Sequence, residues 1–544
     1  MKKLAPWLPP LAVFAAFWPC LDASFVNWDD PGNIVSNPWL ATPAVLRHAF
    51  TSTHYGHFQP LSWLSLSLDA LIGGGRPAVF HLSAVLLHAA AALALFLLLK
   101  TLLRPLPAPD GRKALAAALA ACLWAVHPLR VEAVAWATER RELLAVLFLL
   151  VSARAYAAGR RRAAFLAFVA AALSKVTAAV FPLVLLAWDH WTDGPLDRAS
   201  LARRVREKAP YLAVSAVALL LGVRAQAVSG TAVPFSVFGP LERLAQAAFG
   251  PGYYLWKTVW PANLSPFVFV DCRDEPGRWL PYAALTAAFL AWAWLTRRSR
   301  AQSALHAAML LFLLPSLGFF KSGPQTAADR FFHMASLPLS VAAAFALARA
   351  GGRAGLAAAL AVFAFIPLTR AQSLVWQDSV SLWARAYDSV ERPTPLVVQN
   401  LAVALREAGR EEEAVALLTR LIADAPGSPA SHAVQADGLY EAGDFAGAER
   451  LYARALALND DLPAVRINHG LSLYKLGRLA EAEAAFARAV AQDPRNSDAW
   501  HNLGVITARR GAYDEADAHL ARALELSPGR ADSLRVRALL RGAK

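Results

Sequence analysis

Long apolar runs without charged residues alternate with short charged segments over the first 370 residues of the chain. A helix needs about 20 apolar residues to cross a bilayer, and flanking Arg or Lys side chains extend shorter runs by reaching for the interface. The pattern therefore predicts an all-α, polytopic membrane domain over residues 1–370. Its predicted spans are 4–21, 78–99, 114–129, about 142–158, two within 163–191, and then 209–224, 279–296, 301–320, 331–348 and 354–370.

Basic residues predict the direction of each span, because Lys and Arg gather in cytoplasmic loops. Lys2 and Lys3 place the N-terminus in the cytoplasm, and further basic clusters follow after every second span. This parity predicts about eleven spans, with an outer loop over 22–77 and an outer location for everything after Arg370. The segment 244–270 must then cross an even number of times, so we expect it to be re-entrant or interfacial.

A period of 34 residues begins near residue 395. Its eighth position is small, its twenty-fourth is large and apolar, and its thirty-second is mostly proline. Small residues let two helices approach, the large residue fills the space between repeats, and proline ends the second helix. This pattern predicts a tetratricopeptide α-solenoid that binds extended peptides or partner proteins. The predicted units are a helical linker over 371–394, repeats over 395–428, 429–462, 463–496 and 497–530, and a capping helix over 531–544.

Composition supports the membrane assignment and excludes some functions. Hydrophobic residues make up 57% of the chain and charged residues only 17%, against about 25% charged in soluble domains. The net charge of +14 is spread over short clusters between apolar runs, which argues against a nucleic-acid-binding protein. The three cysteines are scattered, so they predict neither a disulfide framework nor a CxxC site.

The segment FVNWDDPGNIVSN, residues 25–37, places Asp29 and Asp30 directly after the first predicted span. One interpretation is an acidic Asp-Asp-Pro-Gly turn. The other is a catalytic carboxylate at the membrane surface, because a neighbouring carboxylate and a low-dielectric edge raise the pKa of an Asp toward that of a useful base. The residues alone leave both interpretations open.

Seven segments precede the repeats in a specific order. They are FVNWDDPGNIVSN, HFQPLSWLSLSLDALIGG, FHLSAVLLHA, WAVHPLRVEAVAWATERRELL, LSKVTAAVFPLVLL, YYLWKTVWPANLSP and ADRFFHMASLP. In these segments, and over essentially its whole length, the chain resembles bacterial relatives of the TMTC proteins. That family consists of transmembrane O-mannosyltransferases with tetratricopeptide repeats, within the GT-C class of glycosyltransferases.

The resemblance implies that Asp29 and Asp30 form the catalytic motif and that the donor is a sugar on a polyprenyl phosphate. Two positions depart from the family pattern. The family often has Asn where Ala84 stands, and Asp where Glu142 stands. The first departure removes a polar group near His81. The second keeps the negative charge but places it on a side chain that is longer by one methylene group.

Transfer from a polyprenyl phosphate to a hydroxyl needs a base for the acceptor's proton and cations for the departing phosphate. We expect His54, His57 and Gln59, in the same outer loop, to line the sugar pocket. Two His residues without a third ligand do not predict a metal site, although a divalent cation at the acidic pair stays open.

Two groups of residues complete the predicted site. Glu132, Trp136, Glu139 and Arg140 recur at helical spacing, which predicts one face of an outer helix. Trp136 is interpreted as either a sugar-stacking ring or a headgroup anchor. Outer cations are candidates for phosphate binding, the alternative for each being a snorkelling interface residue. They are Arg140, Lys175 at an outer bend, Lys257 and Arg330, with Arg130 and Lys321 also on the outer side.

The sequence thus predicts a multi-pass glycosyltransferase of the bacterial inner membrane, which transfers a mannose-like sugar to a hydroxyl acceptor, protein Ser or Thr, on the outer face. Periplasmic repeats would recruit the acceptor, and the apolar positions of linker 371–393 predict a helix stacked onto the repeats. The alternatives are a non-enzymatic repeat scaffold for envelope complexes and a transporter. The scaffold needs only one anchor, and transporters keep polar groups near mid-membrane rather than at outer span ends.

Overall fold

The computed structural model describes residues 4–195, 197–229, 233, 235, 238–272, 275–319, 323–527 and 530–542. Within these ranges every regular element is a helix, apart from one isolated bridge between Val268 and Ala327. The chain forms two compact units, Met1–Ser389 and Val390–Lys544. Lys2, Lys3 and Lys321, which entered the predictions above, lie outside the described residues.

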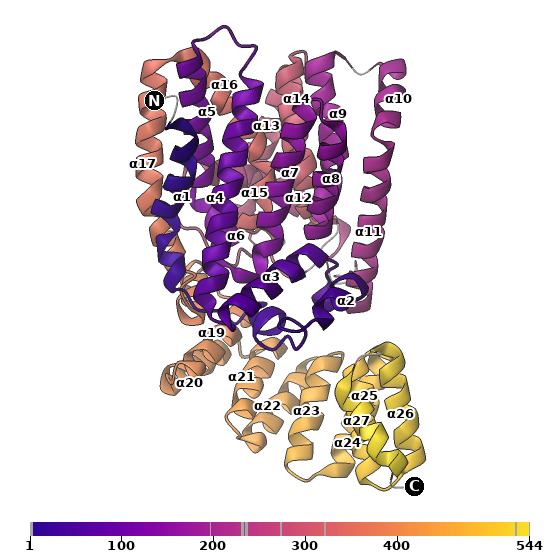
Figure 1. The fold of residues 1–544 in the computed structure, drawn as a ribbon. Helices are drawn as coiled ribbons and strands as arrows, with labels where there is room; N and C mark the ends of the chain where they lie inside the picture. Colours follow the sequence, from indigo (N-terminus) through magenta and orange to yellow (C-terminus); the bar gives the residue numbers. More distant parts are fainter. Residues whose placement is uncertain are drawn as a thin grey trace. The chain divides into compact units, whose positions relative to one another are not determined.

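Each predicted span of the first unit contains a helix, and these helices run side by side in Figure 1. They are α1 (Leu8–Phe17), α4 (Pro77–Leu102), α5 (Asp110–Ala125), α7 (Arg140–Ala157), α8 (Arg161–Ser174), α9 (Phe181–Asp193), α11 (Ala209–Ser229), α13 (Pro276–Leu295), α14 (Arg300–Leu313), α16 (Leu337–Ala350) and α17 (Gly352–Leu374).

Among the described residues, three helices (α4, α11 and α17) are long and apolar enough to cross a membrane by length and composition. Two bent pairs raise this number to five if each pair is one span. The pairs are α5 with Pro128–Ala135, and Asp329–Ala335 with α16. The count of about eleven crossings and their direction remain predictions.

Small side chains bring the helices of the first unit close together. Seven of the ten buried residues of α5 are alanine, and α5 packs against α4, α16 and α17. Small residues at such interfaces permit close van der Waals packing, which replaces the hydrophobic driving force inside a bilayer. The shorter helices α6 (Val131–Ala135) and α15 (Phe332–Ala335) lie between these long helices and contribute to the site described below.

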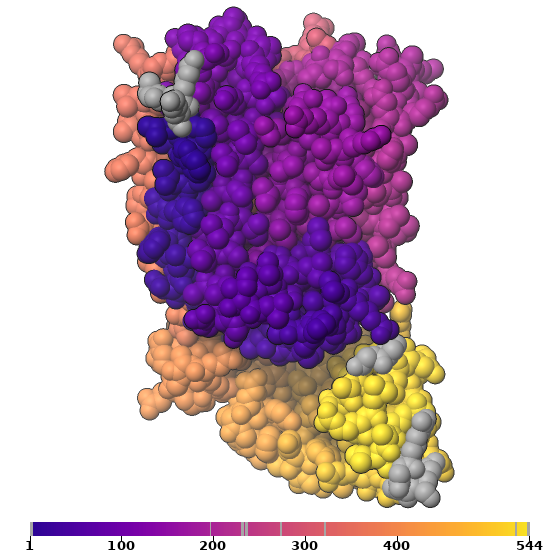
Figure 2. All heavy atoms as spheres, viewed as in Figure 1, coloured from indigo at the N-terminus to yellow at the C-terminus, as the bar shows by residue number. Residues whose placement is uncertain are grey.

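The segment 22–77 covers one end of the first unit with its own short helices, α2 (Ala44–Thr51) and α3 (Pro60–Gly73) (Figure 1). An apolar cluster that includes Ile34, Trp63 and Leu66 packs this segment onto Phe80 of α4 and onto Ala137. Figure 2 shows the segment as a continuous indigo-to-purple surface over that end of the helices. The acidic pair is therefore carried by a folded cap rather than by an open loop.

The segment predicted to be re-entrant or interfacial is mostly one helix. Helix α12 (Pro240–Val259) continues through Pro251 and packs along α13. Arg243, near its start, donates to the carbonyl of Gly318 at 2.8 Å, and the Tyr254 hydroxyl donates to the carbonyl of Ala328 at 3.0 Å. Helix α10 (Arg198–Glu207) joins α9 to α11.

The predicted linker contains a helix, and its stacking onto the repeats remains a prediction. Its helix α18 (Ser379–Asp388) belongs to the first unit, which ends at Ser389. Its apolar face, including Leu382 and Trp383, is buried. Part of this face packs within the first unit, where the ring of Trp383 lies 5.0 Å from that of Trp28.

The second unit consists of helix pairs followed by a final helix. The first helices of the pairs begin at 395, 429, 463 and 497, the positions from which the 34-residue period was counted. The pairs are α19 (Pro395–Glu407) with α20 (Glu411–Asp424), α21 (Pro429–Glu441) with α22 (Phe445–Leu458), α23 (Pro463–Lys475) with α24 (Leu479–Gln492), and α25 (Ser497–Arg509) with α26 (Tyr513–Leu526), and the final helix is α27 (Ala531–Gly542).

Contacts within each pair explain the small and large positions of the period. A Cβ on Gly470 would lie 2.7 Å from the ring of Phe486, and one on Gly504 would lie 2.7 Å from Leu520. Any larger side chain at these glycines would push the two helices of the pair apart. The repeat pattern is thus enforced inside each pair.

Candidate active site

The backbone breaks at Trp136, so Glu132, Trp136, Glu139 and Arg140 do not share one helix face. Helix α6 ends at Ala135, and Trp136 is extended with φ −83° and ψ 113°. A short 3-10 turn, Ala137–Glu139, precedes α7. The prediction of a single outer helix is wrong, because packing the Trp136 ring into the core outweighs continuation of the helix.

Trp136 is only 1% exposed, which contradicts both interpretations of it as a surface ring. Its ring lies 4.9 Å from that of Trp28 and 5.6 Å from that of Trp376. The guanidinium of Arg330 lies 5.2 Å from its centroid. Trp136 therefore anchors the turn that follows it, and it presents no open face to a sugar or to lipid headgroups.

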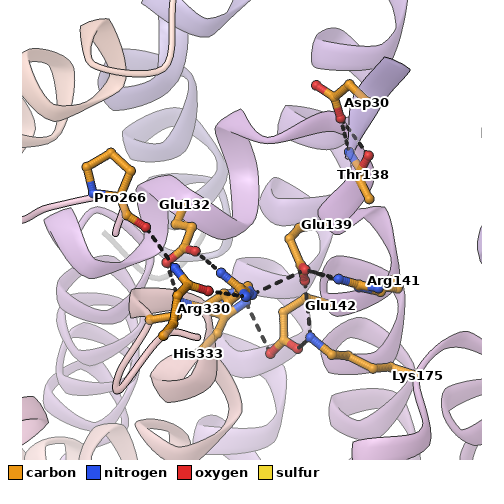
Figure 3. A network of polar contacts seen from close by, with 12 residues as sticks. Asp30, Glu132, Thr138, Glu139, Arg141, Glu142, Lys175, Pro266, Arg330 and His333 are labelled. Carbon is orange, nitrogen blue, oxygen red and sulfur yellow. Dashed lines mark hydrogen bonds and ion pairs between the residues drawn. The ribbon is translucent and has the colours of Figure 1, made fainter. Parts of the chain in front are cut away.

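The two neighbouring carboxylates of the acidic pair have different environments. Both oxygens of buried Asp30 accept hydrogen bonds, one from the Val26 N–H at 3.1 Å and the other from the Thr138 N–H at 3.0 Å and hydroxyl at 2.5 Å (Figure 3). Burial raises the pKa of Asp30 to about 6, against these opposing hydrogen bonds. Asp30 thereby ties the acidic segment to the 3-10 turn.

Asp29 is half-buried, and its carboxylate has no hydrogen bond or ion pair within the described ranges. Burial raises the pKa of Asp29 above its usual value of 3.8, and the charges of Arg141 and Arg330 only partly offset this rise. A carboxylate that is free to accept, partly desolvated and raised in pKa has the properties of a general base. Of the pair, Asp29 is the one available for chemistry.

Glu139 gathers three cations around one fully buried carboxylate, as Figure 3 shows. Arg141 donates to it through Nε at 3.0 Å and Nη2 at 2.6 Å, Lys175 through Nζ at 3.1 Å, and Arg330 Nε lies at 3.4 Å. Burial opposes ionisation of Glu139, but these three charges outweigh it and hold its pKa well below the usual 4.5. The glutamate therefore fixes the positions of three cationic side chains.

Two further carboxylates extend this network. Glu132 pairs with the guanidinium of Arg330 and accepts its backbone N–H at 3.0 Å. Glu142 accepts from Lys175 at 2.9 Å and lies 3.7 Å from His333 Nδ1. The charged residues of this network come from five places in the chain: α6, the 3-10 turn, α7, the break after α8, and the turn before α15. Lys175 is extended between α8 and the next short turn, so a break occurs where the outer bend was predicted.

Sequence reasoning missed Arg141. Its Nη1 is buried and has no hydrogen-bond partner in the described part of the chain, so one donor of this guanidinium is left unsatisfied. The assumption of a continuous helix drew attention to Arg140 and away from Arg141. The signal that could have found it is its place between Glu139 and Glu142, both of which were considered.

Arg140 and Lys257, predicted to bind phosphate, lie outside this network. Arg140 forms a buried pair with Asp69 at 2.7 Å and donates to Ser83 at 2.6 Å and to the carbonyl of Phe80 at 2.8 Å. Lys257 donates through Nζ to the carbonyl of Ala262 at 2.6 Å. Both cations are occupied in holding backbone and helices of the first unit.

The three outer-loop residues predicted to line a sugar pocket are separated. His54 is held at the carbonyl of Gly32 at 3.1 Å, within a group of rings that includes Trp39 and Trp63. Gln59 is buried at the start of α3. The charges of the cation network act on His57. Burial, together with repulsion from Arg141, holds the pKa of His57 well below 6.5. His57 alone remains near the network, as a neutral ring.

The donor atoms around the acidic pair do not form a site for a divalent cation. Both oxygens of Asp30 already accept from N–H and O–H groups, so the pair offers only one free carboxylate. In the ranges that the structure describes, no cluster of three or more His, Cys, Asp or Glu residues is arranged to hold a metal ion.

An apolar cavity lies among α4, α7, α9, α14 and α16. Phe181 and Leu337 line it at the starts of α9 and α16, and they follow Lys175 and Arg330 within seven residues. The cavity is therefore lined by the starts of two helices that lie close in sequence to two of the three clustered cations.

Comparison with known proteins identifies the second unit. Two family models, both described as tetratricopeptide repeat, match residues 399–428 and 467–531. The second unit is a tetratricopeptide-repeat array. Among solved structures, a thermophilic repeat protein of Thermus thermophilus aligns with 33% of this chain and 94% of its own, at 22% identity and a TM-score of 0.27.

The chain is also similar in part to protein O-mannosyl-transferases. Tmtc1 of Drosophila melanogaster is 36% identical over 124 residues, which is 23% of this chain and 13% of that protein. TMTC3 of Homo sapiens is 29% identical over 154 residues, or 26% of this chain and 16% of that protein. The matches thus span 13% and 16% of the lengths of these curated relatives.

Proposed function

We propose that this protein is a multi-pass membrane glycosyltransferase that moves a mannose-like sugar from a polyprenyl-phosphate donor to a hydroxyl acceptor. One observation carries the proposal. The unpaired carboxylate of Asp29 interacts electrostatically with Arg141 and Arg330. These are two of the three cations clustered on Glu139. A base beside a set of cations is what this transfer requires. The partial similarity to protein O-mannosyl-transferases supports the choice of sugar.

The cations would bind the phosphate that links sugar and lipid. The Glu139 carboxylate is fully buried, whereas the side chains of Lys175 and Arg330 keep 14% and 11% of their surface exposed. Glu139 therefore holds the cations from the protein side, and an anion at their exposed surface would compete with Glu132 for Arg330 and with Glu142 for Lys175. Arg141 would add its positive charge and the unpartnered Nη1 group, since its Nε and Nη2 atoms are bound to Glu139.

In the proposed reaction the acceptor hydroxyl attacks the anomeric carbon of the sugar. The new C–O bond forms as the bond from that carbon to the phosphate oxygen breaks, and the polyprenyl phosphate leaves as an anion. Asp29 takes the hydroxyl proton, while Lys175, Arg330 and Arg141 stabilise the charge that develops on the phosphate. The phosphate needs no proton to leave, so one carboxylate suffices.

The apolar cavity would accept part of the polyprenyl chain. It is lined by apolar side chains from five helices, Phe181 and Leu337 among them. A lipid whose phosphate is held by Lys175 and Arg330 could place its first isoprene groups there. Burial of such groups stabilises a complex by about 25 cal/mol per Å² of apolar surface.

We further propose that the acceptor is protein Ser or Thr, recruited by the repeats, and that transfer takes place on the outer face of a bacterial inner membrane, with the repeats in the periplasm. Tetratricopeptide arrays present a concave surface suited to extended peptides. The directions of the spans follow from the positive-inside bias.

A transfer assay in membranes tests this proposal. Full-length protein is supplied with a radiolabelled polyprenyl-phosphate mannose and a Ser/Thr-rich peptide, and label in the peptide is measured. Asp29→Asn should abolish transfer, whereas Asp22→Asn, at an exposed position in the same outer segment, should leave it unchanged. Wild-type transfer by Asp29→Asn would overturn the proposed base. Absence of transfer by the wild type with any polyprenyl-phosphate sugar would instead favour the scaffold.

A further inference from the structure

The residue before the proposed base is held by a cluster of tryptophans. The ring of Trp28 lies 4.9 Å from Trp136, 5.0 Å from Trp383 and 6.5 Å from Trp376, with which it is stacked. Trp376 and Trp383 both belong to the segment between α17 and the repeats, and both are about 1% exposed. A segment that the sequence presents as a linker therefore packs directly against the acidic loop.

Hydrogen bonds fix the same contact from both sides. The indole N–H of Trp383 donates to Oδ1 of Asn27 at 2.6 Å, and the N–H of Asn27 donates to the hydroxyl of Ser379 at 2.9 Å. The N–H of Ser24 donates to the carbonyl of Gln377 at 2.8 Å. Ser24 and Asn27 are thus tied to residues more than 350 positions later in the chain.

Helix α18 is itself anchored on its far side. Arg385 donates through Nε to the carbonyl of Leu264 at 3.1 Å, and the hydroxyls of Ser389 and Ser265 are 2.9 Å apart. The helix therefore bridges the acidic loop and the segment after α12. Because α18 is held on both sides, a movement of this helix would also move Asn27 and Trp28.

Asp29 depends on its neighbours for its position. Its carboxylate has no hydrogen bond of its own in the described ranges. On its C-terminal side, Asp30 is fixed by Thr138 and Val26. On its N-terminal side, Trp28 and Asn27 are fixed by α18. These two contacts, or clamps, flank Asp29 on both sides, and the Asn33 N–H donates to the Asp29 carbonyl at 3.0 Å, so the backbone rather than the carboxylate fixes the position of this residue.

We infer that α18, through Trp383 and Asn27, is a positioning element for Asp29 and not a passive connection to the repeats. This inference rests on the proposed function. Misplacement of a catalytic group by about 1 Å can lower a rate about 100-fold. Because α18 ends at Asp388 and the repeat unit begins at Val390, the clamp is also the last element of the first unit before the repeats.

The test compares Trp383→Phe, Asn27→Ala and the double variant in the full-length protein. Trp383→Phe keeps a ring in the cluster but removes the N–H donor, so kcat should fall about tenfold while the KM values for donor and acceptor stay within about twofold. Both single variants break the same hydrogen bond, so the double variant should be no slower than the slower single one. Trp279→Phe, which removes an indole bond to the carbonyl of Cys272 at 3.1 Å, is the matched control and should keep wild-type kcat.

A pH profile separates positioning from general loss of structure. The charged groups that act on Asp29 are Arg141, Arg330 and Glu139, with Asp30 beside it. A looser clamp hydrates Asp29 without removing these groups, so the acid limb of kcat/KM should move to lower pH in Trp383→Phe but not in Trp279→Phe.

Two results would overturn the inference. One is wild-type kcat and an unchanged acid limb in both clamp variants while Asp29→Asn is inactive. The other is an equal loss in Trp279→Phe, which would indicate a packing defect without specificity. Active Asp29→Asn would instead overturn the proposed function, so the two failures are distinguishable.

Discussion

Thr138 donates both its backbone N–H and its hydroxyl to one oxygen of Asp30, at 3.0 and 2.5 Å. This double contact joins the acidic segment to the turn that carries Glu139. It also occupies both acceptor sites of that oxygen, while the other oxygen accepts the Val26 N–H. The pair Asp29-Asp30 therefore divides into a group available for proton transfer and a group that fixes the local fold.

The first prediction follows from this division. Asp29→Asn should lower kcat by about 10²–10⁴, the range expected for loss of a general base, with an unchanged thermal midpoint. Asp30→Asn should place an amide N–H₂ against the Val26 or Thr138 donors and destabilise the protein by about 1–3 kcal/mol. Both are measured by the membrane transfer assay and by thermal unfolding of the purified protein. The reverse pattern, a stable but inactive Asp30→Asn and an active Asp29→Asn, would assign the base to Asp30.

The second prediction concerns pH. The base must be ionised to accept a proton, and burial raises the pKa of Asp29 above 3.8. Activity should therefore rise as pH increases through this raised pKa and be lost as pH falls below it. The pKa of His57 is held well below 6.5, so its ring stays neutral near pH 6.5 and adds no inflection there.

The measurement is kcat/KM for the donor across pH, in the wild type and in His57→Gln. Both should show the same acid limb, since the limb belongs to Asp29. A limb that disappears in His57→Gln would assign the titrating group to His57 and contradict the proposed role of Asp29.

The third prediction concerns the cations. Lys175→Met, Arg330→Gln and Arg141→Gln each remove one positive charge from the group around Glu139 and should lower kcat/KM for the donor about tenfold to 100-fold. Lys257→Met is the matched control, because its Nζ donates to the carbonyl of Ala262 and not to this group. It should change donor dependence less than twofold. If the three variants keep wild-type donor dependence and Lys257→Met does not, the phosphate site lies near α12.

The fold of the repeats was accessible from the sequence because the contacts that enforce it are local. Gly470 and Phe486, or Gly504 and Leu520, lie 16 residues apart in one helix pair, so spacing alone reveals them. Each repeat start was predicted from such positions. The sequence could not show that α18 belongs to the first unit, because an apolar helix face can pack against either unit. The contact that the structure shows is with the tryptophans around Trp28, which lie far away in the sequence.

The candidate site was accessible only in part. The resemblance directed attention to Asp29 and the predicted topology to Lys175 and Arg330, but helical periodicity grouped Arg140 with Glu132 and passed over Arg141. Periodicity assumes that the helix continues, and the break at Trp136 rotates the following residues by an amount that no local pattern encodes. Contacts such as Arg330 with Glu132 join residues 198 positions apart, so they become visible only in three dimensions.

The fourth prediction concerns topology. An odd number of spans after a cytoplasmic start places the repeats outside. Glu412→Cys, at an exposed position of α20, should react with a membrane-impermeant maleimide in intact cells whose outer membrane is permeabilised. Cys20 and Cys122 are buried, so only half-buried Cys272 needs replacing by Ala to remove the background. Ala163→Cys, beside a predicted cytoplasmic cluster, should react only after the inner membrane is opened. If Glu412→Cys reacts only after the inner membrane is opened, the repeats do not lie outside that membrane.

The last prediction separates chemistry from acceptor choice. The first unit ends at Ser389 and has its own buried core, so a chain that ends there keeps the acidic pair, the cation network and α18. If the repeats select the acceptor, this chain should still glycosylate a short Ser/Thr peptide, because the peptide reaches the site by diffusion. Transfer to the native acceptor protein should collapse, since the repeats no longer raise its effective concentration at the site. A chain that ends at Arg370 is the matched comparison. It lacks Trp376 and Trp383, so Asp29 loses its clamp and transfer to both acceptors should fall. Unchanged glycosylation of the native protein by the chain ending at Ser389 would show that the repeats do not select the acceptor, and would leave them a role in binding other partners.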